Sequence, residues 1–174
     1  MCKQTGLHPS AFRTFFPSEE ALLDAVYEAL VEECAAQLQI GVDQFIPVGN
    51  EAADLVEAAF VLARARPLDR GGLIIRAHRR LNGLRNPGRA DSVVQAEKRF
   101  LVELVGILVE LMIKTGRRFV WQELLAARVI VDTYERSFEA WMLAGHDEHH
   151  FHESDYIRRT LPVLFAELTD SVLT

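Results

Sequence analysis

Apolar side chains recur every three or four residues along almost the whole chain, which is the spacing of one face of an α-helix. No segment shows the sustained alternation of apolar and polar residues that marks a strand. Short breaks containing Gly, Pro or Asn separate the periodic segments. We therefore expect an all-α helical bundle with a first helix ending near residue 5 and further helices over 9–15, 19–40, 51–65, 68–81, 93–114, 119–143 and 154–173.

Specific residues predict where these helices begin and end. Ser18 can cap the third helix, and Ser92 with Gln95 three residues later resembles a capping box at the start of the sixth. We expect residues 82–89, which contain two glycines and a proline, to form the loop before it.

Three further breaks predict the ends of the later helices. Thr115-Gly116 should end the sixth helix, and Gly145 should end the seventh. Pro162 falls inside the eighth predicted helix and should kink it or leave a local gap in its hydrogen bonding.

The sixth predicted helix is apolar on nearly all sides, so other helices must surround it. Glu103, Gly106 and Glu110 are the exception, and their spacing places them on one narrow face. That face could be a solvated edge of the bundle, or it could line a cavity.

The last two predicted helices carry broad apolar faces that suit a symmetric interface of four helices, two from each subunit. The alternative is that these faces pack inside one chain, and the stripes are wide enough for both. The candidate interface residues are Tyr134, Phe138, Trp141, Leu161, Leu164, Phe165 and Leu168.

Composition narrows the class of protein. Apolar residues make up 49% of the 174 residues, and the net charge of −6 excludes a polycation that coats nucleic acid. The longest apolar stretch, residues 100–113, is interrupted by two glutamates and is too short for a membrane span. Two cysteines, Cys2 and Cys34, suit a reducing compartment. We expect no signal peptide, no membrane contact and a cytoplasmic location.

One segment is strongly basic although the whole chain has a net negative charge: residues 64–89 contain eight arginines and a single acid. It could be a solvated basic face that balances acidic neighbours. It is also possible that Arg76, His78 or Arg79 reaches inward to bind an acidic effector, since a guanidinium suits a carboxylate or phosphate.

Catalytic and metal-binding motifs are weak. Four histidines lie between His146 and His152, which are ligand types for Zn²⁺ or Ni²⁺, but their spacing matches no rigid site and favours an exposed polar loop. The sequence has no phosphate-binding glycine loop, no GxSxG and no Cys/His pairing at a meaningful spacing. We therefore expect neither an enzyme nor a bound metal or other cofactor.

The most specific pattern occupies residues 1–30: a helix end, a Thr5-Gly6-Leu7 turn, a short helix, Phe16-Pro17-Ser18 and a new amphipathic helix. This order resembles the rear half of the DNA-binding domain of TetR-like bacterial transcriptional regulators. In that family a helix-turn-helix ends in an aromatic residue followed by Phe-Pro-Ser, and a connecting helix then leads to the ligand domain. The rest of the chain resembles the family in the number, order and length of its helices.

The resemblance implies that a recognition helix faces base edges while neighbouring groups hold phosphates. Carried over by position, the DNA-binding residues are His8, Pro9, Ala11, Arg13 and Thr14. His8, Ala11 and Arg13 replace the small capping residue, the hydroxyl and the tyrosine that the family favours. Glu19 replaces a lysine and would repel a phosphate. In this family the region that corresponds to residues 64–89 adjoins the DNA-binding domain, so the resemblance implies that it could transmit ligand state or add a phosphate contact.

The family's first helix and the front of its second have no counterpart in the chain. We therefore expect the natural protein to contain further residues before Met1. We also expect the chain as given to bind DNA weakly or not at all.

The resemblance divides the chain into residues 1–40, a helix-turn-helix remnant plus connecting helix, and residues 41–174, a ligand-binding and dimerisation domain. It implies a homodimeric repressor that senses a small hydrophobic or aromatic molecule and binds a DNA operator when the missing N-terminal helix is present. Two alternatives are a ligand-binding, dimerising module without DNA binding and a metal-binding helical protein. The candidate ligand-binding residues are Phe60, His78, Phe100, Glu103 and Trp121.

Overall fold

The structure is a computed structural model that describes residues 16–172, and the structural statements below refer to these residues. The predicted DNA-binding residues His8, Pro9, Ala11, Arg13 and Thr14 lie outside them, as do the two predicted N-terminal helices.

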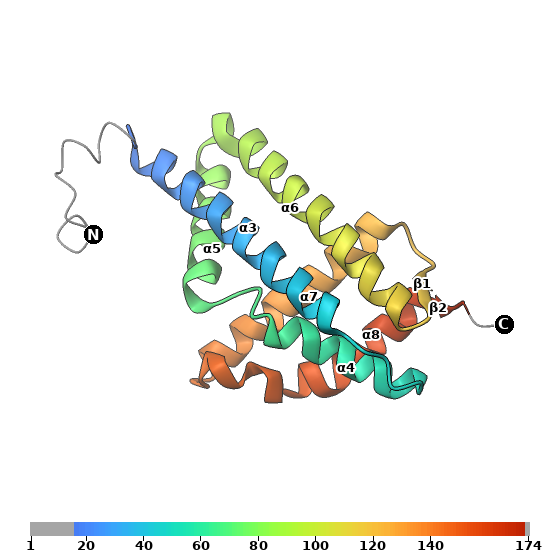
Figure 1. The fold of residues 1–174 in the computed structure, drawn as a ribbon. Helices are drawn as coiled ribbons and strands as arrows, with labels where there is room; N and C mark the ends of the chain where they lie inside the picture. Colours follow the sequence, from blue (N-terminus) through green and yellow to red (C-terminus); the bar gives the residue numbers. More distant parts are fainter. Residues whose placement is uncertain (1–15, 173–174) are drawn as a thin grey trace.

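Helices make up almost all of the described chain, which confirms the all-α prediction (Figure 1). The elements are α3 (Glu19–Gln44), α4 (Glu51–Arg64), α5 (Arg70–Arg85), α6 (Pro87–Lys114), β1 (Arg117–Phe119), α7 (Glu123–Leu143), the 3₁₀-helix η1 (Glu148–Glu153), the π-helix η2 (Tyr156–Thr160), α8 (Leu161–Leu168) and β2 (Thr169–Ser171).

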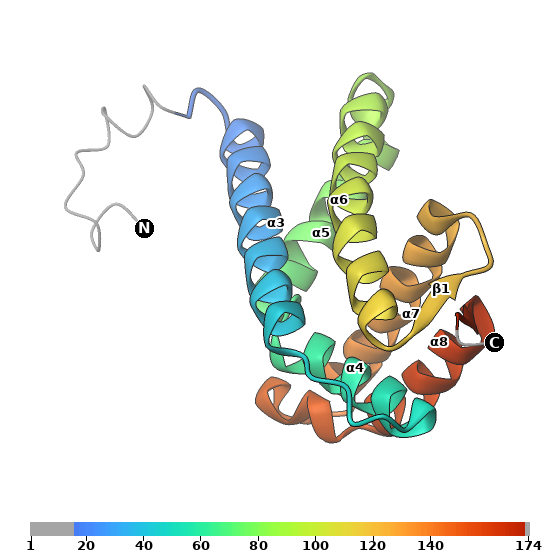
Figure 2. The ribbon, with the colours of Figure 1, turned by 45° about the vertical axis from the view of Figure 1, so that its right-hand side comes forward.

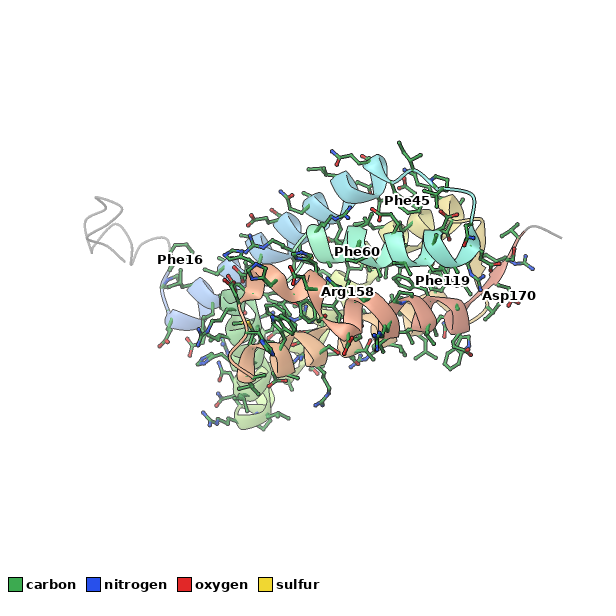
Figure 3. The ribbon with its side chains drawn as sticks, turned by 90° about the horizontal axis from the view of Figure 1, so that it is seen from below. Phe16, Phe45, Phe60, Phe119, Arg158 and Asp170 are labelled. Carbon is green, nitrogen blue, oxygen red and sulfur yellow. The ribbon has the colours of Figure 1, made fainter. Side chains whose placement is uncertain are left out.

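The long helix α6 organises the packing, because it contacts α3, α5 and α7. Figure 2 shows α3 and α6 rising above the end of the molecule that α4 and α8 cover. Seen from below, α4 lies alongside η2 and α8 (Figure 3), and these elements contact each other. The core draws on α3, α4, α6, α7 and α8, and among its members Leu111, Met112, Phe138, Leu161 and Phe165 are fully buried. Within residues 16–172, none of the helices combines the length and apolar character that a membrane crossing requires.

Local capping signals in the sequence predict several helix ends correctly. The Ser18 hydroxyl accepts a hydrogen bond from the Ala21 N–H at 3.1 Å and caps α3. Gly116 and Gly145 follow α6 and α7 with φ of 75° and 83°, a left-handed conformation that glycine adopts without a steric penalty. Both glycines therefore stop a helix where the sequence predicts.

The boundary between α5 and α6 differs from the prediction. Residues 82–89 do not form a loop, because α5 continues to Arg85 and α6 begins at Pro87. Pro87 lies in the first turn of α6, where its missing N–H costs no helical hydrogen bond. Ser92 is inside α6 and donates its hydroxyl hydrogen to the Arg89 carbonyl, so the predicted capping box is wrong.

Two short strands replace parts of the helices predicted over 119–143 and 154–173. β1 and β2 pair antiparallel, with Arg117 opposite Ser171 and Phe119 opposite Thr169. The buried Arg117 guanidinium fixes this pairing: its Nε donates to the Thr169 hydroxyl at 2.6 Å, and Nη2 donates to the Thr169 and Ala166 carbonyls. The expectation that the body contains no strand is wrong here, because these long-range bonds outweigh local helix propensity.

Pro162 disturbs the last helical segment, as predicted. The N–H of Leu161 bonds to the carbonyl of Tyr156, five residues earlier, and residues Tyr156–Thr160 form a π-helix. Because Pro162 has no N–H and its ring crowds the preceding turn, a regular α-helix cannot run through this point. The helix restarts at Leu161 with Pro162 in its first turn.

Most of the candidate interface residues belong to the core of the chain itself. Tyr134, Phe138, Leu161, Phe165 and Leu168 are buried, whereas Trp141 and Leu164 are partly buried against the core. The alternative of packing inside one chain therefore applies to the five buried residues. An interface between copies would need other side chains.

The narrow face of α6 is a solvated edge. Glu103 and Gly106 are exposed, and a Cβ added at Gly106 would meet nothing within 4 Å. Glu110 is partly exposed and accepts a hydrogen bond from Gln39 Nε2 at 3.0 Å. This face therefore does not line a cavity.

We predict that Arg117→Ala lowers the free energy of unfolding by about 3 kcal/mol, because it leaves the buried Thr169 carbonyl without its donor. Arg118→Ala, an exposed neighbour in β1, should change it by less than about 0.5 kcal/mol. Urea unfolding followed by circular dichroism measures both values. Equal losses in the two variants would contradict the anchoring role of Arg117.

Candidate functional site

Three arginines on one face of α5 point into the molecule. Arg76, Arg79 and Arg80 are spaced three and four residues apart, so they lie on adjoining turns of the helix. Arg76 and Arg79 are buried, Arg80 is partly buried, and His78 between them is exposed. One alternative for the basic segment is that Arg76, His78 or Arg79 reaches inward to bind an acidic effector; Arg76 and Arg79 do reach inward, whereas His78 does not.

Arg76 and Arg80 form a network with two glutamates from neighbouring helices. Arg76 Nη2 lies 3.2 Å from Glu97 Oε2 of α6 and 3.4 Å from Glu135 Oε2 of α7. Arg80 contacts the same two carboxylates at 3.4 Å and 2.8 Å. The side chains of Arg76 and Glu135 are only 9% and 10% exposed. We call these four residues the charge network; it is electrically neutral and joins α5, α6 and α7.

Arg79 makes a separate pair with α3. Its Nη2 lies 2.9 Å from Asp24 Oδ1, and its guanidinium carbon lies 3.9 Å from the centre of the Tyr27 ring. The Arg76 guanidinium lies 4.7 Å from the centre of the Phe100 ring in the same region. Both buried cations therefore combine a carboxylate partner with an aromatic face.

Two pockets adjoin this cluster. The outer pocket, of about 350 Å³, lies among α3, the α4–α5 linker, α5 and α6. The inner pocket, of about 50 Å³, is almost wholly apolar and extends toward α7. Both pockets are lined by Pro67, Leu68, Arg76 and Phe100, so they adjoin along these side chains.

Buried polar atoms beside the outer pocket lack hydrogen-bond partners among the described residues. They are Tyr27 Oη and Arg76 Nε, and Arg79 Nη1 is a third such atom nearby. Tyr27 and Arg76 both line the outer pocket, and Tyr27 is only 2% exposed. A buried polar group without a partner is costly, and such groups point to a ligand or an ordered water.

Burial controls the protonation of two groups that line the outer pocket. It raises the pKa of the Tyr27 phenol to about 12 and that of the Cys34 thiol to about 12. At neutral pH Tyr27 is therefore a hydrogen-bond donor, and Cys34 is an uncharged thiol. Because the thiolate is the reactive form, this arrangement suits binding and not nucleophilic chemistry.

The α4–α5 linker closes one side of the outer pocket in a constrained conformation. Arg66 has φ of 49°, the left-handed region that a side chain with a Cβ seldom adopts. Glu148 of η1 holds the linker, because it lies 3.7 Å from Arg66 Nη2 and accepts the backbone N–H of Arg70 at 3.0 Å. This linker also lines a further pocket of about 270 Å³ on its opposite side, next to Phe138 and His149.

A wider groove of about 840 Å³ lies among α5, α6 and α7 and is lined by Leu84, Val94 and Leu125. Arg80, Glu97 and Glu135 also line it, so the charge network separates this groove from the inner pocket. Its lining contains none of the buried, unpartnered polar atoms. We therefore assign the outer and inner pockets as the candidate binding site despite their smaller volume.

The structure does not bring the predicted ligand-binding residues together. Phe100 lines both pockets, and Phe60 packs partly buried against the core. His78, Glu103 and Trp121 are exposed and line neither the outer nor the inner pocket. His78 and Glu103 lie on helix faces that point to solvent, whereas Trp121 lies in the turn before α7, and helix spacing alone does not reveal either.

The sequence does not distinguish Tyr27 and Cys34 from the other positions of the connecting helix. It does contain a signal for the charge network, because Glu135 directly follows the apolar stripe residue Tyr134 and lies three residues before Phe138. An acid at the edge of an apolar face, together with an arginine-rich helix elsewhere in the chain, indicates a buried ion pair.

The histidine segment forms η1 and not an open loop. Asp147 caps it, Phe151 is buried, and His146, His149 and His150 are exposed. Across the described chain, no three or more His, Cys, Asp or Glu side chains come together in a way that could hold a metal ion.

None of the known protein-family models, curated proteins or solved structures compared with the chain matches it.

We predict that Glu135→Ala lowers the free energy of unfolding by about 3 kcal/mol, because Arg76 and Arg80 lose a buried partner. Asp132→Ala, one turn earlier on α7, removes only an exposed pair with Arg128 and should cost less than about 0.5 kcal/mol. Denaturant unfolding of both variants measures the difference. A loss of under about 1 kcal/mol for Glu135→Ala would contradict a stabilising charge network.

We also predict that stability falls in alkali. A raised pKa in the folded chain means that stability is fully present below the unfolded pKa, which is 9.0 for Cys34 and 10.0 for Tyr27. It is then lost as the pH rises toward about 12. Urea unfolding at pH 8, 10 and 11 under reducing conditions should show this decline. Cys34→Ala should show a smaller decline, and identical pH dependence in the two proteins would refute the assignment to Cys34.

Proposed function

We propose that this chain is the sensing part of a TetR-like transcriptional regulator, which binds a small molecule in the outer and inner pockets. The observation that carries the proposal is the pairing of a pocket with two buried donors, Tyr27 Oη and Arg76 Nε, that have no partner among the described residues. Binding pockets combine apolar surface with polar groups that orient the ligand. Here the inner pocket supplies the apolar surface, and the outer pocket supplies the polar groups.

The place of the outer pocket supports a regulatory role. Tyr27 and Cys34 belong to α3, the helix that follows the segment resembling a DNA-binding domain, whereas Arg76 belongs to α5 and Phe100 to α6. A ligand that contacts all of these side chains would favour one position of α3 relative to α5. Because α3 directly follows the N-terminal segment in the sequence, a ligand that shifts α3 would also change the position of a DNA-binding domain at that end.

The proposal includes a homodimer, as expected for a regulator that reads two half-sites. The exposed apolar residues of α7 and α8 are the candidates for contact between copies, namely Leu125, Leu143 and Val163. A second candidate function is a ligand-binding module without DNA binding. It is supported by the lining of the outer pocket, to which α3, the α4–α5 linker, α5 and α6 contribute.

The central test is a ligand screen by thermal unfolding with a variant that fills the pocket. A diverse panel of small molecules should contain compounds that raise the melting temperature of the chain by several degrees. Leu30→Trp places a large side chain in the outer pocket and should abolish these shifts. Ile40→Trp, on an exposed position of the same helix, should leave them unchanged. Shifts that persist in Leu30→Trp, or a panel without any saturable binder, would overturn the proposed site.

DNA binding separates the two candidate functions. Gel-shift titration with DNA from upstream of its own gene should show weak or no binding by the 174-residue chain. If the open reading frame extends before Met1, the lengthened form should bind tightly, and a ligand from the screen should change that affinity. Ligand binding without DNA binding by the lengthened form would favour the module.

A further inference from the structure

We infer that the ligand of the outer and inner pockets is an uncharged molecule with a carbonyl oxygen and an apolar body, such as an ester, a ketone or a lactone. This inference rests on the proposed function, because it names the chemical class that the proposed site accepts. Three properties of the site lead to it: its charge balance, its unused donors and its apolar inner end.

The buried charges at the site are already balanced. Arg76 and Arg80 face Glu97 and Glu135, and Arg79 faces Asp24, so each buried cation has a carboxylate. The other charged residues of the outer pocket lie on its exposed rim. A carboxylate ligand would add a buried negative charge without a free cation to match it. An acidic effector, one of the possibilities that the sequence left open, therefore does not fit.

A cationic ligand does not fit either. Of the two buried groups that lack partners, Arg76 Nε–H only donates, whereas the Tyr27 hydroxyl can donate or accept. Arg76 is positively charged and would repel an ammonium group placed beside it. The site offers no free buried carboxylate to balance such a group, since Glu97 and Glu135 are engaged by the arginines.

An uncharged carbonyl oxygen meets these constraints. It has two lone pairs, so an oxygen that reaches the Tyr27 hydroxyl or the Arg76 Nε–H can accept from it without adding net charge. The phenol stays protonated at neutral pH because burial raises its pKa to about 12. Such an oxygen would supply a partner that the described residues do not.

The inner pocket explains the apolar body. Leu38, Leu62, Leu104, Leu108 and Ile130 line it, and they come from α3, α4, α6 and α7. The space adjoins the outer pocket along Phe100 and Leu68, and its volume of about 50 Å³ suits the end of an apolar body whose remainder lies in the outer pocket. The site therefore suits a compound that is polar at one end and apolar at the other.

The test uses two sets of compounds matched in shape. One set is methyl 2-naphthoate, 2-naphthoate and 2-ethylnaphthalene, and the other is methyl octanoate, octanoate and nonane. Dissociation constants are measured by equilibrium dialysis, and thermal unfolding is recorded for each compound. We expect each ester to bind about tenfold more tightly than its hydrocarbon and its carboxylate, because only the ester satisfies the donors without adding charge.

Two tyrosine variants show whether the buried hydroxyl makes the difference. Tyr27→Phe should weaken ester binding about fivefold and leave hydrocarbon binding unchanged. The empty protein should be as stable as before or more stable, since the lost hydroxyl has no described partner. Tyr156→Phe is the matched control: its hydroxyl bonds to Thr133 at 3.0 Å outside the pockets, so it should lower stability and leave ester binding unchanged.

The outcomes separate the ligand class from the proposed function. A carboxylate or a hydrocarbon that binds as tightly as its ester, with binding still blocked by Leu30→Trp, would overturn the class and leave the pocket as a binding site. Equal ester affinity in Tyr27→Phe and the unmodified chain would also overturn the class. Ester binding that persists in Leu30→Trp would overturn the site itself, and the proposed function with it.

Discussion

Two arginines and two glutamates meet at the junction of α5, α6 and α7, where little solvent reaches Arg76 and Glu135. Burying charges is expensive, and the cost is offset only when every charge has a partner with good geometry. The charge network therefore works as a unit: Arg76 needs Glu97 and Glu135 together, and each glutamate is shared with Arg80. This requirement fixes the rotation of α5 about its axis and its position along α6 and α7.

The same constraint shapes the candidate site. Because Nη2 of Arg76 is held by the two glutamates, its planar guanidinium is fixed over Phe100 with Nε unused. Arg79, one turn further along α5, is fixed in turn by Asp24 and lies over the Tyr27 ring of α3. Ion pairs that do not depend on a ligand thus hold Arg76 directly, and they hold the Arg79 guanidinium against which the Tyr27 ring lies. A site organised in this way loses little conformational freedom when a ligand binds.

The network also lies between two concave surfaces. The inner pocket touches Arg76 and Glu135 on one side, and the wider groove touches Arg80, Glu97 and Glu135 on the other. A change in how Arg76 is engaged would therefore act on the glutamates that α6 and α7 contribute to the groove. The α4–α5 linker borders the outer pocket, and Glu148 pairs with its Arg66, whose backbone is in the left-handed conformation.

Secondary structure that depends on neighbouring residues was predictable from the sequence. The Ser18 cap, the glycines after α6 and α7, and the disturbance at Pro162 each follow from contacts or dihedral limits within one turn. Two local signals competed for the start of α6. The helix begins at Pro87, whereas Ser92 and Gln95, which resemble a capping box, lie within it.

Features that join distant parts of the chain were decided by the tertiary structure alone. β1 exists because Arg117 bonds to backbone and hydroxyl groups some fifty residues away, and no local pattern encodes that partner. The site likewise depends on which face of each helix turns inward. His78 and Arg79 are adjacent in sequence, yet one is exposed and the other is buried against Tyr27. The sequence by itself determined an all-α chain and many of its helix ends, since those depend on short-range contacts and apolar periodicity. Only the folded chain decided the burial of the charges and the pairing of Tyr27 with Arg76 in one pocket, because both depend on how four separate helices pack.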